Sequence, residues 1–261
     1  MPYWFDQSWR PLKLDLLLPK HQENHKPLPL FVWLCGGGFT VMDKDIWVPE
    51  LIDIARSGFV VASVQYRTSN EAPFPAAIED VKAAIRFLRA HAEQFCIDPE
   101  KVAIGGESAG GHLACMAGVT GQDPMYDKGD YLPYSSAVQA VVDVYGLVDV
   151  TTCLRGPEPD FTTMMLGAQP QDVPEKTREA SPLLRVHPGC PPFFILHGDK
   201  DDMVDPDQSE RLAKALEANG VPFEYLVLQG AGHGDDAFYQ PACKERVIRF
   251  LHRVLQGGKQ E

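Results

Sequence analysis

Short apolar runs alternate along the chain with stretches in which apolar residues recur every three or four positions. Seven runs have the length and composition of β-strands, at residues 12–18, 30–34, 59–66, 102–105, 140–145, 193–196 and 223–228. The middle runs are apolar at almost every position, as is typical of strands buried on both faces of a sheet. The pattern therefore predicts a mostly parallel sheet.

The intervening stretches have the period of amphipathic helices. They predict helices that begin near Trp47, Ala76, Ser108, Asp207 and Asp236. The second is the clearest, because its apolar residues recur at helical spacing from Ile78 to Leu88. Asp207 follows a proline and is expected to be the N-cap of its helix. Strands that alternate with helices predict an α/β fold with helices on both faces of the sheet.

The segment 151–189 is richer in proline, glycine and charge than the rest, and its periodicity is weaker. Inserted between two strands, such a segment is expected to form a small lid or loop over the sheet edge. It is too short for an independent unit, and no internal repeat is present. We therefore expect one α/β domain over residues 1–261.

Composition narrows the possible partners. The 261 residues are 44% hydrophobic and 23% charged, and the formal net charge is −12 with no basic cluster. Nucleic acid and anionic membrane surfaces are therefore poor partners. The chain shows no secretion signal and no membrane-spanning run, and its six cysteines have no metal-ligand spacing. They are interpreted as reduced core thiols of a cytoplasmic protein, whose oligomeric state stays open.

The pentapeptide 106–110 reads G-x-S-x-G, with Ser108 at its centre. It follows the predicted strand 102–105 and precedes an apolar helical stretch. A strand that turns this sharply into a helix holds its serine in a strained conformation and exposes the hydroxyl. The context predicts a nucleophile elbow.

A serine hydroxyl needs a base to accept its proton, and the base needs an acid to orient it. His233 lies among glycines directly after the strand 223–228, where a core role is improbable, so it is the predicted base. The acid is expected after the strand 193–196. The residues there leave five aspartates open: Asp199, Asp201, Asp202, Asp205 and Asp207. His112 is expected to be structural, and His197 is given little weight.

A negative oxygen that forms during acyl transfer needs preorganised N–H donors. The residues after strand 30–34 are Cys35, three glycines and Phe39, which offer consecutive unobstructed backbone amides. Together with the N–H of Ala109 they predict an oxyanion hole. Phe39 and Trp47 are candidates for the acyl-binding side, although both could equally be core aromatics.

At this point the chain resembles the hormone-sensitive-lipase-like and feruloyl/acetyl-esterase-like carboxylesterases of the α/β-hydrolase superfamily. The resemblance runs from about Lys13 to Leu251. It includes the HGGG-like loop at 35–39, the Y-R…P-A-A-x-x-D-V stretch at 66–81, the G-[ED]-S-A-G-G segment at 106–111 and the final G-H-G. It implies a catalytic triad of Ser108, Asp201 and His233, with Gly37, Gly38 and Ala109 as oxyanion donors.

Three departures from the family pattern are visible. Cys35 replaces the usual histidine of the oxyanion loop, and Asp205 replaces a proline of the acid loop. The N-terminal helical cap of the lipase-like branch is also expected to be missing, which favours the compact esterase branch. The resemblance implies hydrolysis of short-chain acyl esters, such as acetyl esters of sugars or aryl alcohols, without metal or cofactor.

Two other functions stay open at this point. An arylformamidase-like amide hydrolase would use the same triad on a formyl-anilide. The second function belongs to a different class: a relative of the hydrolases that binds a small molecule and no longer catalyses a reaction. The survival of Ser108, the acid loop and His233 favours the enzyme.

Overall fold

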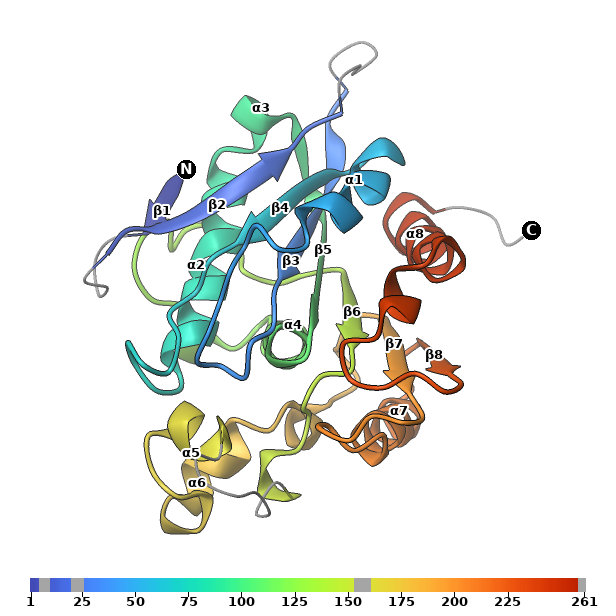
Figure 1. Ribbon diagram of the computed structural model, residues 1–261. Helices are drawn as coiled ribbons and strands as arrows, with labels where there is room; N and C mark the ends of the chain where they lie inside the picture. Colours follow the sequence, from blue (N-terminus) through green and yellow to red (C-terminus); the bar gives the residue numbers. More distant parts are fainter. Residues whose placement is uncertain (5–9, 20–25, 153–160, 258–261) are drawn as a thin grey trace.

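The computed structural model describes residues 1–4, 10–19, 26–152 and 161–257. Its centre is a sheet of eight described strands in the order β1-β2-β4-β3-β5-β6-β7-β8 (Figure 1). The strands are β1 Pro2–Trp4, β2 Leu12–Leu17, β3 Leu28–Leu34, β4 Val60–Val64, β5 Ile97–Glu107, β6 Ala140–Val144, β7 Phe193–Gly198 and β8 Phe223–Leu228. The first two run antiparallel to their neighbours, and every other pair is parallel. The mostly parallel α/β sheet predicted from the pattern is confirmed.

The strand predictions differ from the structure mainly at the strand ends. Strand β4 is shorter than predicted, and β5 begins earlier, at Ile97. Strand β1 was not predicted, because three residues are too few to show a period. It forms where Pro2 and Trp4 pair with Lys13 and Leu12 of β2.

Eight described helices surround the sheet: α1 Val48–Arg56, α2 Ala76–Ala90, α3 Ala92–Phe95, α4 Ala109–Val119, α5 Phe161–Leu166, α6 Pro174–Glu179, α7 Asp207–Ala218 and α8 Pro241–Gln256. Short 3₁₀ helices are η2 Pro124–Tyr126, η3 Val150–Thr152, η4 Pro170–Asp172, η5 Pro182–Arg185 and η6 Asp236–Tyr239.

One predicted helix start and one predicted N-cap are wrong, whereas the predicted start of α7 near Asp207 is confirmed. Residues 236–239 form only the turn η6, and the last helix begins at Pro241, since a proline at the first helical position loses no hydrogen bond. Asp207 is not an N-cap but the first residue of α7. Its N–H bonds the carboxylate of Asp205 at 3.0 Å instead.

Strand β3 shows how the core is divided between the two faces. Leu30, Val32 and Leu34 point into the cluster that includes residues of α2, α4 and α7, whereas Phe31 and Trp33 point into the cluster with α1 and α8. Successive side chains of a strand face opposite sides, so a wholly apolar strand contributes to both layers. Helices therefore cover both faces of the sheet (Figure 1).

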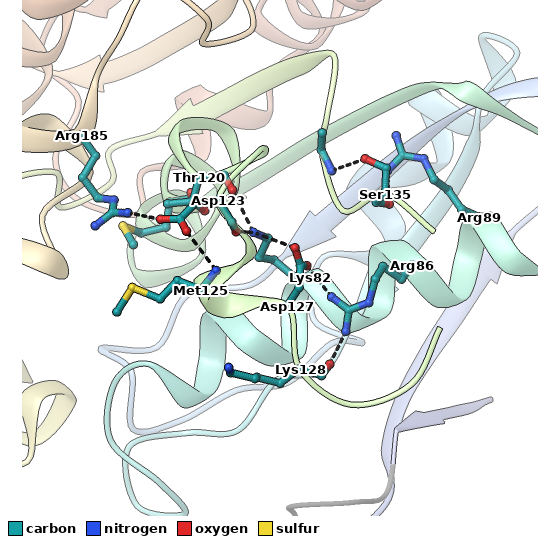
Figure 2. Close-up of polar contacts among 12 residues, drawn as sticks. Lys82, Arg86, Arg89, Thr120, Asp123, Met125, Asp127, Lys128, Ser135 and Arg185 are labelled. Carbon is teal, nitrogen blue, oxygen red and sulfur yellow. Dashed lines mark hydrogen bonds and ion pairs between the residues drawn. The ribbon is translucent and has the colours of Figure 1, made fainter. Parts of the chain in front are cut away.

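The loop between α4 and β6 is held by buried cations of α2 (Figure 2). The ammonium of Lys82 donates to the carbonyls of Thr120 and Asp123 at 2.8 and 2.7 Å. The guanidinium of Arg86 binds the carboxylate of Asp127 at 2.6 Å and also the carbonyl of Lys128. Because Lys82 and Arg86 are fully buried, these bonds compensate the loss of hydration.

The segment 151–189 connects β6 to β7. Its described part consists of α5, α6 and the short turns η4 and η5, which gather at one end of the molecule (Figure 1). Helix α5 is joined to the rest by a bond from the N–H of Phe74 to the carbonyl of Met165 at 2.7 Å. The residues 153–160 of the expected lid lie outside the described part of the chain.

Candidate active site

Ser108 lies at the carboxyl end of β5, where the chain turns into α4. Its backbone has φ 53° and ψ −119°, a conformation that costs free energy for any residue with a Cβ. Its N–H bonds the carbonyl of Val144 on the neighbouring strand at 2.9 Å, which fixes the turn to the sheet. The strained serine predicted from the pentapeptide is present.

The two glycines around Ser108 are required by close backbone approaches. A Cβ at Gly106 would collide with the backbone of Gly110, and a Cβ at Gly110 would collide with the carbonyl of Leu34 on β3. Larger side chains at either position would push the helix away from the sheet. The local sequence therefore folds into this turn because only hydrogen atoms fit there.

The structure brings three of the sequence-predicted side chains together at the carboxyl edge of the sheet. The Oγ of Ser108 lies 3.0 Å from Nε2 of His233, and Nδ1 of His233 lies 2.7 Å from Oδ2 of Asp201. The imidazole is slightly exposed and the carboxylate is fully buried. A serine, a histidine and an aspartate connected in this order have the geometry in which a nucleophile, a base and an orienting acid can act together.

The four other aspartates of the acid loop serve different purposes. Asp199 accepts a bond from the N–H of Gly230 at 2.6 Å, and Asp205 accepts the bond from the first residue of α7. Asp207 lies 3.8 Å from Arg211, and Asp202 is exposed. The residues alone left five alternatives, and the packing brings Asp201, the aspartate that the resemblance implies, against His233.

The carboxylate of Asp201 is held by strong donors. Burial by itself would raise the pKa of this group, but hydrogen bonds from His197 and His233 and from the N–H of Val204 hold the pKa well below its ordinary value. The carboxylate therefore stays ionised opposite the imidazole of His233.

The loop after β3 presents its backbone amides near the serine. Gly37 and Gly38 have φ values of 126° and 57°, which glycine adopts without strain. Among the described residues, the N–H groups of Gly37, Gly38 and Ala109 have no hydrogen-bond acceptor. Unpaired N–H groups on this loop and at the start of α4 are suited to bind a negative oxygen.

The loop after β3, with its predicted oxyanion donors, is braced in a way that the sequence did not reveal. The carboxylate of Glu107 accepts bonds from the N–H of Gly36, from Nε1 of Trp47 at 3.0 Å and from the hydroxyl of Tyr145. Burial raises the pKa of Glu107, and the first two bonds oppose this shift. The hydroxyl of Tyr66 also donates to the carbonyl of Cys35 at 2.5 Å. These contacts hold the loop without the histidine that Cys35 replaces.

Tyr145 connects this brace to the base. Its ring lies 4.7 Å from the imidazole of His233 between centroids, and its hydroxyl lies 3.1 Å from that of Tyr239. Tyr239 in turn stacks on Trp47 at 4.1 Å. Tyr145 has a positive φ of 42°, and no sequence pattern pointed to this residue.

The two aromatic candidates for substrate contact have clear places in the structure. Phe39 is 6% exposed and packs edge-on against His112 with ring centroids 5.1 Å apart. Both line a cavity of about 20 Å³ that also contacts Met165 of α5. Trp47 donates through Nε1 to Glu107 and lines a different cavity of about 40 Å³. The indole of Trp47 is therefore engaged in bracing the loop.

Phe161 is a further residue at the site that sequence analysis did not single out. A Cβ at Gly38 would lie 2.7 Å from two carbons of the Phe161 ring, so this ring packs directly on the oxyanion loop. The side chain is still 45% exposed. The first residue of α5, on the segment expected to be a lid, thus lies against the loop that contains Gly38.

The structure also describes His112 and five of the six cysteines. Nδ1 of His112 lies 2.7 Å from the carbonyl of Leu147, and burial lowers the pKa of the ring to about 4, so this histidine is structural. The described cysteines are free: Cys35, Cys96, Cys115, Cys190 and Cys243. The sixth, Cys153, lies outside the described residues. In the described part, no group of three or more His, Cys, Asp or Glu could hold a metal ion, and no helix is long and apolar enough to cross a membrane.

Comparison with solved structures shows the same fold in esterases. A truncated form of a carbohydrate esterase from gut microbiota superposes with a TM-score of 0.87 at 28% identity, over 97% of this chain and 95% of that one. The thermophilic esterase Est2 of Thermogutta terrifontis superposes with a TM-score of 0.79 at 25% identity, over 97% and 93%. The α/β-hydrolase architecture implied by the resemblance is thereby confirmed.

Sequence comparison gives related results. Esterase LipC of Mycobacterium tuberculosis is 36% identical over 219 residues, which cover 81% of this chain and 54% of the relative. An acetyl esterase of Salmonella dublin is 28% identical over 87% of this chain and 69% of its own length. The chain spans about half the length of the first of these relatives. The BD-FAE family model matches residues 14–216, and the chain therefore belongs to the BD-FAE family of α/β-hydrolases.

Proposed function

We propose that this protein is a serine carboxylesterase that hydrolyses short-chain acyl esters through an acyl-enzyme. The observation that carries the proposal is the continuous connection from Ser108 Oγ through His233 to Asp201, with distances of 3.0 and 2.7 Å. Relatives named as esterases support the same reaction class.

The proposed reaction follows from these contacts. Ser108 Oγ attacks the ester carbonyl while Nε2 of His233 accepts the hydroxyl proton, and the buried carboxylate of Asp201 stabilises the resulting imidazolium. His233 then gives this proton to the leaving alcohol. Water attacks the acyl-enzyme by the same route and releases the acid and the free serine.

The developing oxyanion would be bound by the N–H groups of Gly37, Gly38 and Ala109. Support comes from their lack of an acceptor among the described residues and from the brace that holds the loop. Preorganised donors stabilise the transition state because they need no reorientation when the charge forms.

The substrate class is proposed to be neutral esters with a small acyl group, such as acetyl esters of sugars or aryl alcohols. Phe161 narrows the entrance over Gly38. The exposed carboxylates of Asp202, Asp235 and Asp236 follow the acid and the base directly in the chain. Such charges disfavour anionic substrates and favour release of the carboxylate product.

The test measures initial rates on p-nitrophenyl acetate, butyrate and octanoate for the wild type, for Ser108→Ala and for the control Ser57→Ala. Ser57 is the C-cap of α1 and has no part in the proposed reaction. We expect acetate to be the fastest substrate, a loss of several orders of magnitude in kcat for Ser108→Ala, and no change for Ser57→Ala.

Further substrates separate the alternatives. A neutral methyl ester should be cleaved faster than its hemisuccinate analogue at low salt. Turnover of a formyl-anilide without turnover of any ester would instead favour the amide hydrolase. If Ser108→Ala retains the wild-type rate on every substrate, the proposed mechanism is wrong.

A further inference from the structure

A second histidine lies behind the acid of the proposed triad. His197 is on β7, is fully buried, and has Nε2 at 3.2 Å from Oδ2 of Asp201. The same carboxylate oxygen lies 2.7 Å from Nδ1 of His233. Two imidazole rings from different strand ends therefore meet on one oxygen atom.

The neighbours of His197 determine which nitrogen carries the proton. Nε2 faces two acceptors, the carbonyl of Val204 at 3.0 Å and the carboxylate of Asp201, so Nε2 must be a donor. Nδ1 lies 2.7 Å from the hydroxyl of Ser209 on α7, which is also fully buried. When the hydroxyl of Ser209 donates to Nδ1, the ring is neutral and its Nε2–H points at the acid.

Every acceptor position of the carboxylate is then used. Oδ1 of Asp201 accepts bonds from the N–H groups of Met203 and Val204, both at 2.9 Å. Oδ2 accepts bonds from His197 and His233. A carboxylate with four donors has a single orientation, because any rotation would break at least two bonds.

We propose that His197, oriented by Ser209, is a positioning residue that holds Oδ2 of Asp201 in place for His233. The inference rests on the proposed function, since it assigns a role within the same triad. It extends the connection from Ser108 through the sheet to the first turns of α7.

Other titratable groups face this pair and belong in the design of the test. Asp143 on β6 interacts electrostatically with His197, and burial raises the pKa of Asp143 to about 6. The hydroxyl of Tyr145 lies within electrostatic reach of Asp201. Each variant is therefore also prepared in an Asp143→Asn background, in which the first of these groups no longer titrates.

The first experiment compares His197→Leu, His197→Gln and Ser209→Ala with the wild type on p-nitrophenyl acetate between pH 5 and 9. Active sites are counted with a fluorophosphonate probe. Leucine removes the donor, so we expect kcat to fall about 10- to 100-fold with little change in KM. The acidic limb of the kcat/KM profile should move to higher pH. Without the bond from His197, the carboxylate of Asp201 interacts more strongly with the imidazolium of His233 and stabilises it.

The other two variants keep the test decisive if His197→Leu does not fold. The amide nitrogen of glutamine can replace Nε2 as a donor, so His197→Gln should recover much of the rate and of the profile. Ser209→Ala keeps the ring but removes the group that selects its tautomer, so a smaller shift in the same direction is expected. A structural role alone would lower the melting temperature and leave kcat per active site and the pH profile unchanged, which would overturn the proposal.

A spectroscopic measurement separates this inference from the proposed function. The Nδ1 proton of His233 on Asp201 should give a low-field proton resonance, which His197→Gln and Ser209→Ala should shift. A shift in a protein without serine-dependent turnover would support the positioning contact and reject the esterase. An active enzyme whose resonance and pH profile are unaffected in all three variants would reject the role of His197.

Discussion

At the scale of single residues, the site depends on buried polar groups whose partners are all present. Glu107 receives three donors from three parts of the chain: Gly36, Trp47 and Tyr145. Only its place inside the nucleophile motif makes this residue conspicuous in the sequence, and that motif assigns it no partner. Because Glu107 precedes Ser108 in the chain, its carboxylate can bind Gly36 and so brace the loop after β3 close to the serine.

This brace makes a prediction for Glu107→Ala. The N–H of Gly36 and the indole of Trp47 would lose their acceptor, so the loop would be less well ordered. We expect kcat to fall about 100-fold with KM little changed, since the effect resembles the loss of one oxyanion donor. The free energy of unfolding should fall by about 1–3 kcal/mol. Steady-state kinetics and denaturant unfolding measure the two quantities.

Glu100→Ala provides the matched control, because Glu100 lies exposed on the same strand. It should leave kcat and stability unchanged, and Glu107→Gln should recover part of the loss by keeping an acceptor. Wild-type kcat in Glu107→Ala would show that the loop holds its geometry without the carboxylate.

At the scale of elements, helix α2 is notable for polar residues on its buried side. Lys82, Arg86 and Arg89 are all buried and donate mainly to backbone carbonyls of neighbouring loops (Figure 2). The loop that they hold leads into β6, the strand that precedes Tyr145. The arrangement therefore links the helix packing on one face of the sheet to the site at its edge.

We predict that Arg86→Met lowers the free energy of unfolding by about 3 kcal/mol, measured by denaturant titration. The substitution leaves the carboxylate of Asp127 and the carbonyls of Lys128 and Asp130 with fewer donors. The loss is costly because a fully buried guanidinium supplies donors to three groups of one loop, and a partner left without its hydrogen bond loses that stabilisation.

The control is Arg56→Met, at the end of α1, where the arginine is 77% exposed and lies 3.7 Å from Asp53. An exposed pair contributes little, so the change should stay within about 0.5 kcal/mol. If Arg86→Met and Arg56→Met lower the free energy of unfolding equally, burial of the arginine does not determine the effect.

At the scale of the whole molecule, stability depends on acidic groups that folding removes from water. Asp143 in the middle of the sheet is fully buried, and desolvation raises its pKa from 3.8 to about 6. Between these values the folded state binds more protons than the unfolded state. The contribution of Asp143 to stability therefore falls as pH rises from about 4 to about 6.

We predict that the free energy of unfolding of the wild type, relative to Asp143→Asn, is about 2 kcal/mol higher at pH 4 than at pH 7. His112 acts in the opposite direction, because burial lowers its pKa to about 4, but it is present in both proteins and cancels in the difference. Denaturant unfolding of both proteins at several pH values measures this difference in the free energy of unfolding. A flat result for Asp143→Asn would contradict the prediction.

Much of the fold could be predicted from the sequence because it depends on local patterns. The apolar runs located the strands within a few residues, and the glycines around Ser108 indicated the sharp turn. The errors arose where neighbours in space decide: β1 exists only because β2 pairs with it, and α8 begins at Pro241 after the turn η6.

The sequence by itself determined the α/β architecture and the positions of Ser108 and His233, since strand periodicity and glycine-rich turns act over a few residues. The residues alone left five aspartates open, and the resemblance implied Asp201, which the tertiary structure places against His233. Only the tertiary structure brought Glu107, Tyr145 and His197 to the same edge of the sheet. The contacts of the site join residues up to 125 positions apart, the separation of Ser108 and His233. Distances of this kind depend on how whole strands and helices pack, and no local pattern of residue types encodes them.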